Sequence, residues 1–266
     1  RNTILTHVHS GAMGWISLSA LAATLWLFGG PTTVAGAARV RQLAWLAAIS
    51  IPFYVIAFWT GNLVFRAVTG VVVMVAIGWW LWWTWSAYRA APPTVPRLAF
   101  LAGIVTLTYG SAVGVLLQIQ YATESSFLPI DSVGAHVAAM AFSYLVLVGM
   151  GIVEWRLTGE SAGISRGGAV QVIALFLSGL VLSVGALVGA IQVAGGLNLV
   201  GELIGVAIFV ARMAGPVGRA PWFRASADRL FGIAAIFVVI DILILAYLIY
   251  GVISGSYGED LTSIPA

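Results

Sequence analysis

Eight apolar runs, each about 20 residues long, constrain this 266-residue chain more than any other feature of its sequence. A helix of about 20 apolar residues spans the hydrocarbon core of a bilayer, and in lipid its backbone polar groups must be satisfied within the helix itself. We therefore predict an all-α integral membrane bundle of about eight transmembrane helices, forming a single domain over residues 1–266. The expected spans are 10–30, 43–63, 67–88, 98–118, 133–155, 169–193, 198–217 and 229–253. They occupy most of the chain, so any chemistry must lie in the helix bundle or in partner proteins.

The distribution of arginine indicates how the chain is oriented. Ten arginines fall in the loops that follow the first, third, fifth and seventh spans, and the positive-inside rule makes that side cytoplasmic. They are Arg39, Arg41, Arg89, Arg97, Arg156, Arg166, Arg212, Arg219, Arg224 and Arg229. Both ends of the sequence then lie outside, and we predict a multi-pass protein of a prokaryotic inner membrane. Because the sequence begins at Arg1 with no signal-peptide pattern, we also expect a further helix or a leader to precede it.

Composition excludes several kinds of site. The chain has no cysteine, which rules out iron–sulfur ligation, thiolate zinc sites, disulfides and covalent c-type haem attachment. Its net charge of +3 comes from arginines that topology already explains, so no nucleic-acid partner is predicted.

Only three histidines are present, and two of them begin a repeated pattern. His9-Ser-Gly-Ala-Met13 opens the first span and His136-Val-Ala-Ala-Met140 opens the fifth, each followed by a small residue and an aromatic one. An offset of four spans is what two four-helix repeats, over 1–120 and 130–255, would produce. Both helices run from outside to inside, so the two histidines are expected at similar depth. This geometry suits a flat macrocycle ligated from both faces.

The third histidine, His7, forms an HxH pair with His9. Successive helical residues turn by about 100°, so the two rings point about 200° apart and cannot ligate one metal from a regular helix. His7 could be an alternative haem ligand, a hydrogen-bonding partner near a haem propionate, or the ligand of a second centre. If the helix start is frayed, the pair could instead hold a surface copper or zinc ion. A lone membrane histidine can also simply hydrogen-bond a neighbouring helix.

The Thr6-His7-Val8-His9 stretch and the small, aromatic-rich helix after it resemble the HxH helix of the haem–copper oxidase and nitric oxide reductase superfamily. In that family one histidine of the pair binds the low-spin haem and the other binds the active-site haem. His9-x-x-x-Met13 is also similar to the family's other low-spin-haem helix, in which Met follows His by four residues. The resemblance covers about twenty residues of the first span, with a weaker echo at His136.

The departures from the family pattern limit what the resemblance implies. The binuclear centre of that family needs an adjacent His-His pair, which this chain lacks. A bis-His haem b ligated by His9 and His136 requires only what is present. The resemblance therefore implies a reduced relative without terminal reductase activity of its own. The predicted cofactor-binding set is His9, His136, His7, Met13, Met140 and Glu202, with His9 and His136 on the haem iron.

Two carboxylates in the last spans are further candidates. Asp241 lies near the middle of the span 229–253, where a carboxylate is costly unless paired or protonated. We predict either a proton-relay residue or a protonated structural group. Glu202, expected near the outer end of its span, could hydrogen-bond His7 or a ligand imidazole.

These observations predict a membrane cytochrome b-like electron-transfer subunit, with no catalytic residues of its own. It would hold one haem b near the outer face, a second haem being the alternative. It would relay electrons between quinol or another membrane or periplasmic redox subunit and an acceptor. Two other functions stay open: a haem-free anchor subunit of a respiratory complex, and a proton- or metal-coupled transporter.

Overall fold

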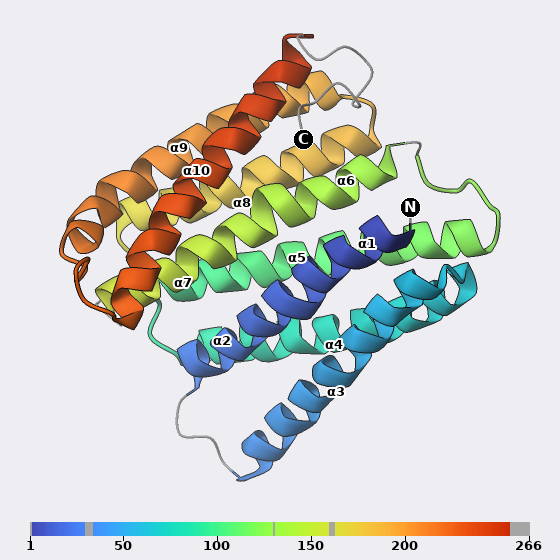
Figure 1. Ribbon diagram of the computed structural model, residues 1–266, viewed down its shortest axis with the longest axis horizontal. Coiled ribbons are helices and arrows are strands. Elements are labelled where there is room, and N and C mark those ends of the chain that lie inside the picture. The colour runs from blue at the N-terminus through green and yellow to red at the C-terminus, as the bar shows by residue number, and fades with distance from the viewer. Residues whose placement is uncertain (1, 30–33, 130, 160–162, 256–266) are drawn as a thin grey trace. The chain divides into compact units, whose positions relative to one another are not determined.

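The structure is a computed structural model that describes residues 2–29, 34–129, 131–159 and 163–255 (Figure 1). Within these ranges the chain is helical, has no strand, and contains eight helices long and apolar enough to cross a membrane. The predicted all-α bundle of eight spans is therefore confirmed, while Arg1 lies outside the described residues. The chain divides into two compact units, unit 1 (residues 1–92 and 107–129) and unit 2 (residues 93–106 and 130–266).

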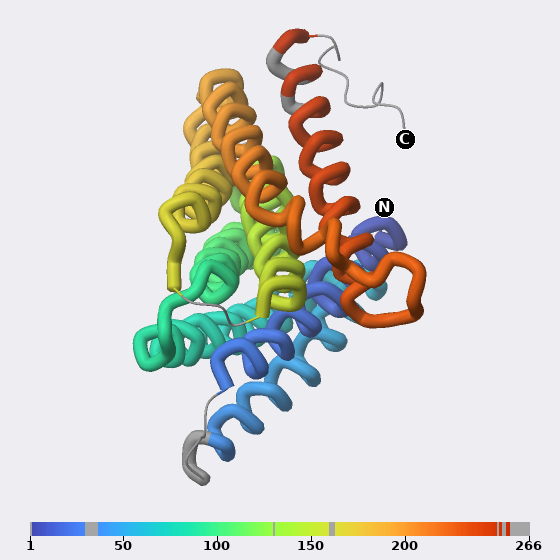
Figure 2. The backbone as a smooth tube through the Cα atoms, turned by 90° about the vertical axis from the view of Figure 1, so that its left-hand side faces the viewer, coloured from blue at the N-terminus to red at the C-terminus, as the bar shows by residue number. Residues whose placement is uncertain are grey.

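Unit 1 is built around an antiparallel hairpin of two long helices, α3 and α4. The first span packs on this hairpin, with α1 along α3 and α2 against both α3 and α4 (Figure 1 and Figure 2). The helices are α1 (Asn2–His9), η1 (Ser10–Ser17), α2 (Leu18–Phe28), α3 (Val34–Thr60), α4 (Leu63–Ala90) and the second half of α5 (Val95–Ala122). The segments α1, η1 and α2 form one uninterrupted helical span, in which η1 is π-helical.

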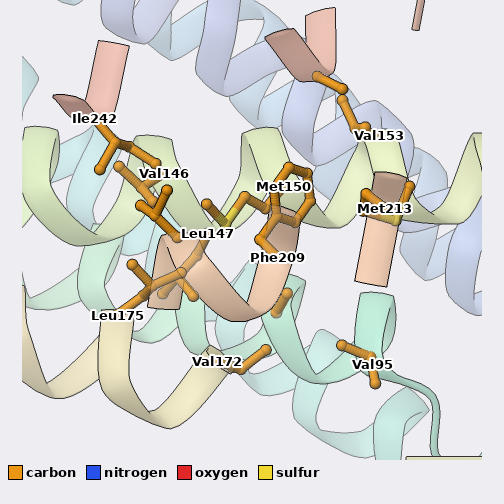
Figure 3. Packing of buried hydrophobic residues seen from close by; sticks show 13 residues of the cluster. Val95, Val146, Leu147, Met150, Val153, Val172, Leu175, Phe209, Met213 and Ile242 are labelled. Carbon is orange, nitrogen blue, oxygen red and sulfur yellow. The ribbon is translucent and has the colours of Figure 1, made fainter. Parts of the chain in front are cut away.

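Unit 2 is organised around α8, which packs against α9 on one side and against α6 and η2 on another; α10 packs on α7 and α9. The helices are α6 (Ser132–Ala139), η2 (Met140–Leu145), α7 (Val146–Thr158), α8 (Arg166–Leu187), α9 (Ile191–Gly218) and α10 (Ala227–Ile253), with the first half of α5. Figure 3 shows Leu147 and Met150 of α7 among side chains of α8 and α9, including Leu175 and Phe209. This buried apolar cluster is the core of the unit.

The turn between α8 and α9 differs from the sequence prediction. The spans 169–193 and 198–217 place the turn near Gly195 and Gly196, whereas α8 ends at Leu187 and α9 begins at Ile191. Gly189 occupies the turn with φ +72°, a left-handed conformation that glycine adopts without steric cost. Gly195 and Gly196 lie inside α9 instead. The hydropathy of this stretch could not locate the turn because the residues on both sides are equally apolar.

The tryptophan-rich end of α4 is not a uniform surface belt. Trp82 and Trp85 are exposed, but Trp80 is buried at 2% exposure, and its Nε1–H donates to Thr24 Oγ1 of α2 at 2.7 Å. A buried indole needs such an acceptor, since its N–H would otherwise be left unsatisfied in an apolar environment. This hydrogen bond therefore ties the first span to α4.

An ion pair joins three helices of unit 2. The guanidinium of Arg212 on α9 donates to both carboxylate oxygens of Glu154 on α7, with Nη1 to Oε2 at 2.9 Å. The same Nη1 donates to Gln171 Oε1 on α8 at 2.8 Å. Glu154 is 4% exposed, and a buried carboxylate of this kind requires charged and hydrogen-bonded partners. These hydrogen bonds therefore link α7, α8 and α9 through the Arg212 guanidinium.

Close packing of α8 on η2 depends on the absence of a side chain at Gly179. A Cβ built there would lie 2.5 Å from Ser143 Cβ and 2.9 Å from the Phe142 carbonyl. We expect Gly179→Ala to destabilise the protein by roughly 1–3 kcal/mol, as overpacking does. Thermal unfolding in detergent, followed by circular dichroism, measures this.

Gly196→Ala in α9 is the matched control, because nothing lies within 4 Å of a Cβ at that position. We expect this variant to melt at or above the wild-type temperature, since alanine is the better helix former. Equal destabilisation of both variants would contradict the close-packing explanation.

Candidate functional site

The beginning of the first span carries an aromatic and basic cluster in unit 1, the His9 cluster (His9, Tyr54, Phe58 and Arg66). The His9 and Phe58 rings stack with centroids 3.8 Å apart at an interplanar angle of 17°. Tyr54 meets both rings edge-on, with centroids 5.9 Å from His9 and 5.0 Å from Phe58. The His9 imidazole of α1 is thus held against α3 by its contacts with the Tyr54 and Phe58 rings.

One hydrogen bond defines the tautomer of His9. Its Nδ1 lies 2.8 Å from the backbone oxygen of Leu5, one turn earlier on the same helix. A carbonyl oxygen only accepts, so Nδ1 carries the hydrogen, and in the neutral ring the lone pair is on Nε2. Metal-ligating histidines are commonly oriented by this kind of bond from the other ring nitrogen. The half-buried His9 ring therefore has the tautomer that an Nε2 ligand needs.

Arg66 packs against the Phe58 ring and is 5% exposed. Its Nη2 donates to Phe58 O at 2.7 Å and to Asn2 Oδ1 at 3.0 Å, and its Nε donates to Ala57 O at 3.3 Å. Its Cζ lies 4.8 Å from the Phe58 ring centroid, a cation–π geometry. The last carbonyls of a helix lack their usual backbone partners, and here Arg66 shares them with other donors. Thr60 Oγ1 also donates to Ala57 O at 2.9 Å, and Gly61 N donates to Phe58 O at 3.3 Å.

Local sequence brings Arg66 to that position. Gly61, with φ +75°, turns the chain directly after α3, and Asn62 caps α4 by accepting from Phe65 N at 2.9 Å. Arg66 is therefore in the first turn of α4, beside the end of α3. A Cβ on Gly61 would lie 2.5 Å from Asn2 Nδ2, so the start of α1 packs directly on this turn.

Each histidine motif runs into a π-helical segment. The segment η1 begins at Ser10, immediately after His9, and η2 begins at Met140, four residues after His136. The π-helix accounts for well under 1% of residues in soluble proteins and is frequent at functional sites. The two motifs thus share a rare local structure as well as a residue pattern.

The other predicted ligands are placed as follows. Met13 and Met140 are buried, and the Met13 sulfur accepts a hydrogen bond from Ser17 Oγ at 3.7 Å. His7 is exposed, on a different face of α1 from His9. His136 is half-buried on α6 in unit 2, whereas His9 belongs to unit 1. The pairing of His9 with His136 stays a prediction from sequence.

Glu202 lies deeper in its helix than the sequence suggested. It is the twelfth residue of α9, about 16 Å from the helix start, and it is 0% exposed. Its Oε1 accepts from Asn198 Nδ2 at 3.4 Å. Among the described residues, Glu202 Oε2 and Asn198 Oδ1 have no hydrogen-bond partner.

Asp241 lies on α10, about 18 Å from the last residue of that helix, and is exposed on it. Consecutive spans run in opposite directions, so the carboxylates of Glu202 and Asp241 lie at similar depth in unit 2.

In the part of the chain that the structure describes, no group of three or more His, Asp or Glu residues forms a metal site. No protein-family model, curated protein or solved structure matches this chain.

The sequence did not indicate that Tyr54, Phe58 and Arg66 belong to the site. The signal available for Arg66 was its position, since it lies outside the group of ten arginines that the topology explains.

The His9 cluster should contribute measurably to stability through Phe58. Replacing Phe58 with leucine keeps an apolar side chain and removes the ring contacts to His9, Tyr54 and Arg66. We expect a loss of roughly 1–3 kcal/mol, from aromatic pairs of about 0.5–1.5 kcal/mol each and a cation–π contact. Unfolding in a detergent titration, followed by tryptophan fluorescence, tests this.

Phe53→Leu, on the same helix but 54% exposed, is the control and should be near neutral. A Phe58 variant as stable as the Phe53 variant would show that the stack contributes nothing.

Proposed function

We propose that this chain is a membrane electron-transfer subunit similar to a b-type cytochrome, in which His9 ligates a haem iron through Nε2. By the matched His-x-x-x-Met motif, His136 is proposed as the second axial ligand. The chain would work inside a larger oxidoreductase complex, relaying electrons between quinol or a redox partner subunit and an acceptor.

The orientation of His9 is the observation that carries this proposal. The His9 ring is stacked on Phe58 and its Nδ1 is bonded to Leu5 O, so the neutral form of this imidazole would offer Nε2 to a metal.

The ligand types near His9 fit haem iron better than a tetrahedral zinc site. In the described ranges no group of three or more His, Asp or Glu residues could hold a metal ion, and the chain has no cysteine. A haem iron needs only one protein ligand on each face, whereas a structural zinc needs four.

When bound, a haem supplies one-electron redox chemistry. The chain's own residues would position and protect it. Leu5 and Phe58 hold the imidazole in one orientation, and the apolar side chains of the span exclude water and keep the local dielectric low. Tyr54 closes one edge of the His9 ring.

A reduced-minus-oxidised visible spectrum of the purified protein tests the proposal. We expect a sharp low-spin b-type band in the wild type that is lost in His9→Ala and in His136→Ala, because each variant removes an axial ligand. Well-folded wild-type protein without haem would refute the proposal.

His7→Ala is the matched control, because His7 lies on the same helix and is exposed. It should keep the band. Loss of the band in His7→Ala with retention in His9→Ala would exchange the roles of the two histidines.

A second candidate function, proton-coupled transport, is favoured by Glu202. A fully buried carboxylate with an unpartnered oxygen, at the depth of Asp241 on the adjacent helix, is typical of groups that bind and release protons within membranes. This function does not require a haem.

Proteoliposomes loaded with a pH-sensitive dye test this second function under an imposed proton gradient. Proton flux should fall to the rate of empty liposomes in Glu202→Gln and Asp241→Asn, because neither amide can carry the proton. Asp228→Asn, at an exposed acidic residue in the first turn of α10, should leave the flux unchanged. Wild-type flux equal to that of empty liposomes would exclude the function.

A further inference from the structure

We infer that Arg66 raises the reduction potential of the haem iron ligated by His9, by holding a buried positive charge against the Phe58 ring. This inference rests on the proposed haem site and names a residue that tunes it. Arg66 acts as a positioning residue, since its guanidinium packs on the same Phe58 ring that stacks on the imidazole.

The Phe58 ring contacts both His9 and Arg66. The Phe58 ring centroid is 3.8 Å from the centroid of His9 and 4.8 Å from Arg66 Cζ. Because both distances share one ring centre, the guanidinium carbon is within about 9 Å of the imidazole centre, a range over which charges interact appreciably outside bulk water. The charge is therefore close to the ligand.

The position of this charge is fixed by α3 and α1. Hydrogen bonds to Ala57 O, Phe58 O and Asn2 Oδ1 hold the guanidinium. Arginine does not lose its proton in proteins. At 5% exposure, salt and water screen the charge only weakly. Arg66 therefore presents a constant positive charge at any pH at which the protein is folded.

The direction of the effect follows from Coulomb's law. Reduction adds one electron to the ferric haem, and a nearby positive charge stabilises the added negative charge. A neutral residue in place of Arg66 should make the haem harder to reduce. Arg66 also caps α3, so a stability measurement alone cannot separate the two roles, whereas the reduction potential can.

Spectroelectrochemical titration of the haem-loaded protein tests the inference. We expect Arg66→Gln to shift the one-electron equilibrium about tenfold towards the oxidised form, which is about 59 mV to lower potential. Arg66→Lys keeps the charge and should stay near the wild-type potential. Arg89→Gln, an exposed arginine in the last turn of α4, should also leave the potential unchanged.

A second variant keeps the test decisive if Arg66→Gln does not fold. Asn2→Asp places a carboxylate at the atom that already accepts from Arg66 Nη2 at 3.0 Å, with almost no change in shape. It neutralises the charge while every hydrogen bond of Arg66 is retained, so the potential should fall in the same direction.

The outcomes separate the two proposals. Wild-type protein without haem would refute the haem site itself. Bound haem with an unchanged potential in Asn2→Asp and Arg66→Gln would overturn the role of Arg66 alone. A potential in Arg66→Lys as low as in Arg66→Gln would also overturn it, because the charge would then not be the cause.

Discussion

The structure depends on one constraint of the bilayer: every buried polar group must find its partner inside the protein. The ends of helices are where this is hardest, because their last carbonyls have no partner within the helix. At the α3–α4 turn the solution is a guanidinium that donates to Ala57 O and Phe58 O. Gly61 and Asn62 make the turn short enough for Arg66 to reach those carbonyls from the first turn of the next helix. The α3–α4 hairpin of unit 1 is thus held at its turn by hydrogen bonds from Arg66.

Unit 2 meets the same constraint with different residues. Its helices approach closely where side chains are small, as at Gly179 against Ser143, because helices in lipid associate through close packing and hydrogen bonds rather than through a hydrophobic driving force. Arg212 satisfies Glu154 and Gln171 together. The pair Asn198 and Glu202 is the contrast, with one oxygen on each lacking a partner among the described residues. Leaving a buried carboxylate oxygen without a partner costs free energy, and this oxygen lies at the depth of Asp241.

Much of the fold could be predicted because hydropathy alone decides which segments enter a membrane. Eight spans follow from runs of about 20 apolar residues, and the hairpin turn at Gly189 is the exception because apolar residues surround it on both sides. The site was harder to predict. His9 stood out because the chain has only three histidines. Phe58 and Tyr54 are ordinary members of an apolar run, and the sequence does not indicate which of the many aromatic rings contacts the imidazole. The π-helical segments were also invisible, since they arise from hydrogen bonding that has no residue signature.

The His9 cluster joins stability and chemistry through shared contacts. Phe58 contributes its ring to His9 and its carbonyl to Arg66, so the residue that orients the imidazole also receives the cap of α3. Asn2 connects the start of α1 to the same guanidinium. A displacement of α1 relative to the α3–α4 hairpin would therefore disturb the hydrogen bond of Arg66 and the stack on His9 together. A side chain held in this way is positioned by the stability of the whole unit rather than by one contact, and the proposed haem site would require rigidity of this form.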